Sequence, residues 1–159
     1  MTPDPQADRE AVATVVRTFF EAFTSGPGCD ERLDLLPDLF LPEALIVRTC
    51  GGEPTAYDVA AFIVPRRALL TGGSLTDFRE WVLEGRTELF GDIAQHFCSY
   101  AKEWTEDGQR RSGRGMKTLQ LVRTPAGWRI SAAAWDDERE GLSLPEQDAV
   151  SATAPPASR

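Results

Sequence analysis

The sequence has few of the residues that bind transition metals or cross-link a chain. It contains one histidine, His96, and three cysteines, Cys29, Cys50 and Cys98. An odd number of cysteines without C-x-x-C spacing indicates neither a disulfide framework nor a thiolate metal site, and a single histidine supplies no spaced ligand set. We therefore expect no metal site, free thiols and a reducing compartment, which favours a cytoplasmic protein.

Long apolar runs are also missing. The longest, "VAAFIV" at 59–64, is far too short to cross a bilayer, and the acidic segment "MTPDPQADRE" does not resemble a leader. The net charge of −8 argues against binding to nucleic acid or to an anionic membrane. The motifs G-x-S-x-G, G-x-x-x-x-G-K and G-x-G-x-x-G do not occur, so no cofactor is implied.

The 159 residues, 42% of them apolar, are enough for one domain with its own core. Segments with helical periodicity occupy the first part of the sequence. A stripe from Val12 to Phe23 follows a cap at Asp4, and a short helix begins near Asp30 as its cap. A third helix contains Pro65 and follows Thr55 and Asp58, which have capping-box spacing. A strand is expected at 44–49, and four more at 78–90, 93–104, 112–123 and 128–135.

Helices followed by a strand meander predict an α+β fold, a curved antiparallel sheet wrapped around three N-terminal helices. We expect the domain at 8–140, between an N-terminal tail at 1–7 and a Pro-rich, largely disordered C-terminal tail at 141–159.

The turns of the meander set the register of its strands. If "GD" at 91–92, "DG" at 107–108 and "PA" at 125–126 are two-residue hairpin loops, strict alternation sorts each strand into two faces. The charged face then contains Glu84, Arg86, Glu88 and Trp135, and no acid of the hairpins points inward. The apolar face, which we expect against the helices, contains Trp81, Leu83, Gly85, Thr87 and Leu89; Ala94, His96, Cys98, Tyr100, Lys102 and Trp104; Lys117, Leu119 and Leu121; and Trp128, Ile130, Ala132 and Ala134.

This register places His96 on the covered face, between Thr87 and Leu119, and small residues nearby predict a cavity. Two interpretations stay open. His96 is a core histidine bonded to Thr87 or to a backbone carbonyl, or it contacts a ligand, either as a binding residue alone or also as the catalytic acid or base. The predicted ligand-binding residues are Thr87, His96, Cys98, Tyr100, Lys117 and Trp81. Cys98 also fits a small buried hydrophobe, and Lys117 a side chain that extends outward.

Several segments resemble the nuclear transport factor 2-like superfamily over residues 8–140. These are the helical hairpin, "LPDLFLPEALIV", "GDIA" with the following Tyr100, and "RGMKTLQLVRTPAGWRISAAAWDDER". The superfamily is a cystatin-like α+β cone that includes ketosteroid isomerases, scytalone dehydratase, limonene epoxide hydrolase and SnoaL-like polyketide cyclases. No catalytic set of these enzymes transfers residue by residue, and His96 alone is a possible match.

The resemblance implies a cone that binds a small apolar ligand, either as a cofactor-independent isomerase, dehydratase or cyclase, or as a non-catalytic binding or dimerisation module with a filled core. It also implies a homodimer that pairs through the convex face of the sheet. Apolar residues such as Ile93 and Phe97 interrupt the charged face and support that expectation.

Overall fold

The computed structural model of the protein describes residues 4–145. Its elements, in chain order, are α1 (Pro5–Glu21), α2 (Cys29–Leu35), the short 3₁₀ helix η1 (Leu36–Leu39), β1 (Phe40–Arg48), β2 (Thr55–Tyr57), α3 (Val59–Thr71), β3 (Leu75–Phe90), β4 (Ile93–Glu106), β5 (Gln109–Thr124) and β6 (Gly127–Asp137). Within these residues no helix is both long and apolar enough to cross a membrane, and no cluster of metal-ligating side chains occurs.

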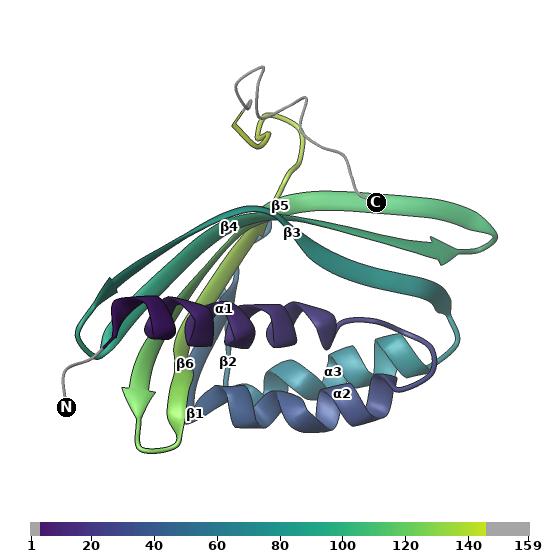
Figure 1. Ribbon diagram of the computed structural model, residues 1–159. Helices are drawn as coiled ribbons and strands as arrows, with labels where there is room; N and C mark the ends of the chain where they lie inside the picture. Colours follow the sequence, from purple (N-terminus) through teal and green to yellow (C-terminus); the bar gives the residue numbers. More distant parts are fainter. Residues whose placement is uncertain (1–3, 146–159) are drawn as a thin grey trace.

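The strands form one curved sheet in the order β2-β1-β6-β5-β4-β3. Its concave side covers α1, α2 and α3, and α2 and α3 lie side by side (Figure 1). The expected α+β cone is therefore confirmed. The sheet is mixed, because β1 runs parallel to β6 while the other neighbouring strands pair antiparallel.

Local signals explain where the helices begin. The Asp4 carboxylate accepts a hydrogen bond from the Gln6 amide at 3.0 Å at the start of α1, and Asp58 accepts one from Ala61 at 2.8 Å at the start of α3. The expected capping box of Thr55 and Asp58 is therefore wrong: Asp58 is itself the cap, and Thr55 lies in β2, which the sequence did not predict. The second helix starts at Cys29, one residue before the expected cap Asp30.

Parts of both expected tails lie outside the residues that the structure describes. Residues 5–7, which were expected to belong to the N-terminal tail, form the first turn of α1, whereas residues 1–3 lie outside the described part. Residues 146–159 of the expected C-terminal tail also lie outside it.

A polar cluster attaches α1 to the hairpin of β5 and β6. Arg123 donates from Nη1 and Nη2 to the two carboxylate oxygens of Asp8, at 2.8 Å each, and the Trp128 indole donates to Asp8 at 3.3 Å. The hydrogen bonds from Arg123 lower the pKa of Asp8 and outweigh the opposing effect of its burial. Asp8 therefore stays ionised next to the apolar stripe of α1.

The three hairpins have the expected register. Phe90 pairs with Ile93, and Thr87 with His96. The loops at 107–108 and 125–126 are also two residues long. Arg86 and Glu88 are solvent-exposed, as the assignment of faces required. The concave side packs on the helices in a core that includes Val12, Val16, Phe19, Phe20, Leu33, Leu36, Phe62, Leu119, Leu121 and Ile130.

Strict alternation fails at three places in the hairpins: one near the start of β3, between Thr76 and Arg79, and two β-bulges that change the faces of the predicted residues. Val82 pairs with Tyr100 but Glu84 with Ser99, so Leu83 is an extra residue in β3. Likewise Gln120 pairs with Ala132 but Leu121 with Ile130, which makes Ser131 the extra residue in β6. Beyond each bulge the two faces are exchanged.

The bulges correct the predicted faces. Trp81, Leu83, Ala132 and Ala134 are not on the concave side, and Val82, Ala133 and Trp135 are. The prediction that no acid of the hairpins points inward is also wrong. In the segments beyond the bulges, Glu80 and Asp137 face the concave side, where they pair with Lys117 and Tyr100.

Candidate ligand-binding site

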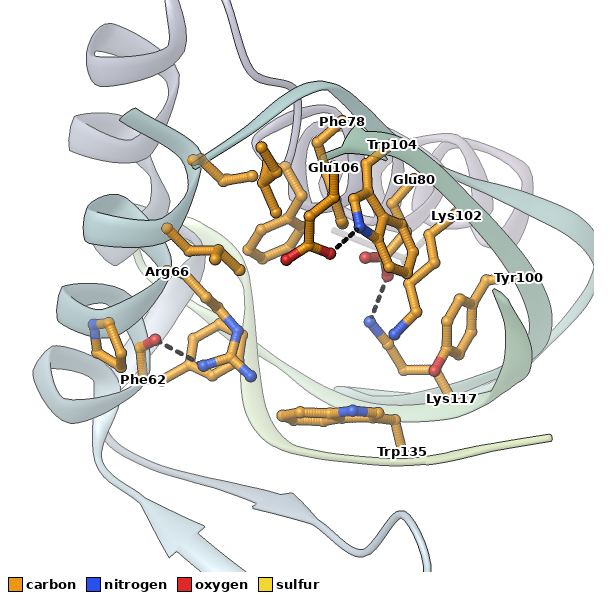
Figure 2. Close-up of a pocket in the computed structure, with 15 residues that line it drawn as sticks. Phe62, Arg66, Phe78, Glu80, Tyr100, Lys102, Trp104, Glu106, Lys117 and Trp135 are labelled. Carbon is orange, nitrogen blue, oxygen red and sulfur yellow. Dashed lines mark hydrogen bonds and ion pairs between the residues drawn. The ribbon is translucent and has the colours of Figure 1, made fainter. Parts of the chain in front are cut away.

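A cavity of about 410 Å³ lies between α3 and the concave side of the sheet. The strand residues that line this cavity belong to the segments of β3 and β6 beyond the bulges and to the ends of β4 and β5 that face α3 (Figure 2). Its walls are Phe23, Phe62, Pro65, Arg66, Leu69, Leu70, Leu75, Phe78, Glu80, Tyr100, Lys102, Trp104, Glu106, Lys117 and Trp135. Aromatic rings and aliphatic side chains dominate this lining, and three cations and two carboxylates interrupt it.

An ion pair between Lys117 and Glu80 forms one wall of the cavity. The Lys117 Nζ atom lies 2.8 Å from the Glu80 carboxylate, and the side chains are only 6% and 9% exposed. Five aromatic rings surround the ammonium group, with centroids 4.6 to 5.9 Å away: Phe19, Phe20, Phe23, Tyr100 and Trp135. Because the rings and the carboxylate both stabilise the cation, Lys117 can remain charged with little access to water.

A second polar group involves Tyr100, Asp137 and Lys102. The Tyr100 hydroxyl donates a short hydrogen bond to Asp137, and the Lys102 ammonium lies 3.1 Å from the other carboxylate oxygen. Burial, and then the neighbouring carboxylate, raise the pKa of Tyr100. Burial alone would raise the pKa of Asp137, but the hydrogen bond from Tyr100 and the charge of Lys102 lower it overall. Asp137 is therefore an anion and Tyr100 a neutral phenol at neutral pH.

A glycine opposite Tyr100 leaves space for its ring and hydroxyl group. Gly115 lies opposite Tyr100 on β5. A Cβ atom at this position would lie 2.6 Å from the Tyr100 hydroxyl oxygen, which is closer than van der Waals contact permits. The ring of Tyr100 therefore crosses β5 only because the facing residue has no side chain.

Arg66 supplies the third cation of the cavity from α3. Its Nη1 donates to the Phe62 carbonyl at 2.9 Å, and the guanidinium carbon lies 4.0 Å from the Phe62 ring centroid and 5.1 Å from that of Trp135. No carboxylate in residues 4–145 forms an ion pair with it, and burial lowers its pKa. The guanidinium nevertheless remains charged at neutral pH.

The residues that the sequence singled out for the site separate into three groups. Tyr100 and Lys117 line the cavity. Trp81 pairs with Ala101 on the convex side, where its ring stacks on Arg79, because the bulge at Leu83 reverses its direction. Thr87, His96 and Cys98 are on the concave side but are not among the lining residues.

Cys98 lies in the buried core, with 1% exposure, and burial raises the pKa of its thiol to about 11. The sequence predicted no cation beside it. In the structure Lys117 on β5 pairs directly with Cys98 on β4. Its positive charge favours the thiolate, but burial has the larger effect on the pKa. Cys98 is therefore an uncharged thiol at neutral pH.

His96 is buried beside the hydroxyl of Thr87, whose oxygen lies 2.8 Å from Nδ1. Its Nε2 atom has no hydrogen-bond partner in the part of the chain that the structure describes. A Cβ atom on Gly85 would lie 2.8 Å from this nitrogen, so the ring packs directly on the glycine backbone. Burial lowers the pKa of His96, which makes the imidazole neutral at pH 7.

Five polar residues at or beside the cavity are missing from the predicted ligand-binding set: Arg66, Glu80, Lys102, Glu106 and Asp137. A signal existed for Arg66, because it follows Phe62 by four residues and therefore lies on the same face of the helix. For Glu80 and Asp137 the alternation pointed to the wrong face, since each is separated from its hairpin turn by a bulge whose extra residue, Leu83 or Ser131, is neither glycine nor proline.

Comparison with known proteins identifies the fold. No family model and no curated protein matches the sequence. Solved structures match most of it. A cystatin-like-fold protein from Novosphingobium aromaticivorans is 20% identical with a TM-score of 0.64, and 83% of this chain and 82% of that one are covered. A dehydratase candidate from Streptomyces avermitilis is 15% identical with a TM-score of 0.68 and coverage of 86% and 99%.

A third similar structure, from Salmonella enterica serovar Typhimurium, belongs to the nuclear transport factor 2-like superfamily. It is 12% identical with a TM-score of 0.70, and 90% of this chain and all of that chain (100%) are covered. The protein therefore has the cystatin-like cone fold of nuclear transport factor 2-like proteins. The identities are too low to transfer an activity, because one fold supports many functions.

Proposed function

We propose that the protein binds a small, mainly apolar molecule in the cavity between α3 and the sheet. The observation that carries this proposal is the cavity itself. Its volume of about 410 Å³ lies in the range of ligand pockets, and a few ionised groups converge among aromatic walls. The domain at 8–140 supplies every one of these walls, so no second domain is needed.

The chemistry that this cavity supports is cofactor-independent proton transfer, as in an isomerase, a dehydratase or a cyclase. Glu80 is a carboxylate at the cavity wall and is the candidate base. Lys117 and Arg66 are cations in the same cavity and would stabilise negative charge that develops on a substrate oxygen. A dehydratase candidate is among the similar folds. The alternative function is binding without turnover.

Binding is tested with 2-naphthamide, a neutral bicyclic probe. The chain has four tryptophans. In ¹H–¹⁵N spectra we expect the indole signals of Trp104 and Trp135, which line the cavity, to move during titration. Those of Trp81 on the convex side and Trp128 beside Asp8 should stay in place.

A pair of variants controls this titration. Leu69→Phe adds a ring at the cavity wall and should weaken binding about tenfold, whereas Val64→Phe, on the exposed side of the same helix, should leave it unchanged. Equal shifts of all four indoles, or none, would contradict the proposal. Ketones that bind are then incubated in D₂O, and deuterium gained only with the protein separates catalysis from simple binding.

We also propose a homodimer that pairs through the convex side of the sheet. Leu83, Ile93 and Phe97 are large apolar residues there with exposures of 42%, 59% and 42%. A second copy would cover them, and twofold pairing is the commonest oligomeric arrangement. Light scattering at micromolar concentration should give twice the chain mass, and Phe97→Glu should reduce it to one. A monomeric mass for the wild-type protein would reject the dimer.

We place the protein in the cytoplasm. Cys29, Cys50 and Cys98 are all free thiols, as a reducing compartment would leave them. Alkylation of the unfolded protein immediately after cell lysis should therefore label all three, and a disulfide found at this step would argue for an oxidising compartment.

A further inference from the structure

We propose that the ligand carries a carboxylate, which Arg66 binds, on a planar aromatic body that lies among the rings of the cavity. This inference rests on the proposed function, because it assigns a chemical class to the molecule in the same cavity. It follows from the partners of each charged group.

Arg66 differs from the other cations of the cavity in having no counter-ion. Lys117 pairs with Glu80, and Lys102 pairs with Asp137. The residue next to Arg66 provides the sharpest contrast. Arg67 reaches Asp30 and Asp34 at 2.6 Å each, while Arg66 forms no ion pair within residues 4–145 and contacts the Phe62 carbonyl and aromatic rings. Glu80 attracts Arg66 from a longer distance, but its carboxylate is already paired with Lys117. The uncompensated positive charge of the cavity is therefore at Arg66.

The position of this guanidinium favours an anion with two oxygens. One of its N–H groups is used by Phe62, and the others are available toward the cavity that Arg66 lines (Figure 2). A guanidinium presents a planar fork that matches a carboxylate with two parallel hydrogen bonds. Because Arg66 is largely shielded from water, such a pair would be stronger than one at the surface.

The carboxylates of the cavity disfavour a ligand with several negative charges. Glu80 and Glu106 also line the cavity, and they would repel the additional charges of a diphosphate or a nucleotide. The rings next to Arg66 select the body of the ligand. Trp135 and Phe62 meet edge to face with centroids 5.8 Å apart, and both contact the guanidinium. A flat apolar acid fits this combination of one free cation and aromatic walls.

The test compares 2-naphthoate with 2-naphthamide, which have the same rings and differ in charge, by calorimetric titration. Wild-type protein should bind the carboxylate at least tenfold more tightly than the amide. Arg66→Met should abolish this preference by weakening 2-naphthoate alone. Arg66→Lys, which keeps the charge without the fork, should retain part of it. Arg67→Met is the matched control and should leave the preference unchanged.

The outcomes separate this inference from the proposed function. If wild-type protein binds both probes equally, or if Arg66→Met weakens both to the same extent, the carboxylate assignment is wrong while the cavity remains a binding site. If neither probe binds wild-type protein, the proposed function fails as well. The wild-type comparison needs no substitution, so the result does not depend on how well a variant folds.

Discussion

Replacing Lys117 with methionine should lower the free energy of unfolding by about 3–5 kcal/mol, the usual effect of removing one partner of a buried ion pair. The Glu80 side chain is 9% exposed, and without Lys117 its carboxylate would lack its ion-pair partner in a mostly aromatic environment. Denaturant unfolding followed by circular dichroism measures the loss. Arg114→Met on the same strand β5 is the control, because the Arg114 side chain is 54% exposed and its pair with Glu138 should contribute at most about 1 kcal/mol.

Substitution of the other member of the ion pair, Glu80, should lower the free energy of unfolding less. In Glu80→Gln the ammonium of Lys117 keeps its five aromatic rings and gains an amide oxygen as acceptor, so the loss should be smaller than in Lys117→Met. The double variant Glu80→Leu with Lys117→Met removes both charges and should recover most of the stability. A loss below about 1 kcal/mol in Lys117→Met would show that the pair is hydrated in solution.

Turn chemistry explains why much of the fold could be predicted. "GD" and "DG" each define a two-residue hairpin, and a hairpin fixes which residues face each other along both strands. The pairs of Thr87 with His96 and of His96 with Leu119 follow directly and are found in the structure. The helices followed from apolar periodicity, and the cap Asp4 followed from capping preference.

The register of the hairpins alone was insufficient to assign every side chain of the site to the correct face of the sheet. A bulge adds one residue, and every side chain beyond it changes face. Leu83 and Ser131 are ordinary strand residues, so nothing in their chemistry marks them as the extra ones. As a result the two acids that meet Lys117 and Tyr100 were assigned to solvent, and the centre of the site was placed at His96. Glu80 and Trp135 in the cavity wall, and Asp137 beside it, lie beyond these two bulges.

His96 is then best explained as a structural residue, and its replacement by alanine should cost about 1–3 kcal/mol at pH 8. The loss has two parts: the hydrogen-bonding partner of Thr87 disappears, and a cavity opens above Gly85. Gln95→Ala, a change at the exposed neighbour on the opposite face of β4, should cost much less. Binding of 2-naphthoate should not change in His96→Ala, because His96 does not line the cavity. Weakened binding with little loss of stability would restore the ligand-contact interpretation.

The difference between wild type and His96→Ala should also depend on pH. Burial lowers the pKa of His96 in the folded state, whereas in the unfolded chain it is near 6.5. As pH falls below about 6.5 the unfolded wild-type chain binds a proton that the folded protein does not yet accept, so wild-type stability decreases. The alanine variant lacks this group, and the gap between the two proteins should therefore narrow from pH 8 to pH 5. A gap that stays constant would mean that the imidazole is as accessible to protons in the folded protein as in the unfolded chain, and the packing of His96 on Gly85 would then not persist in solution.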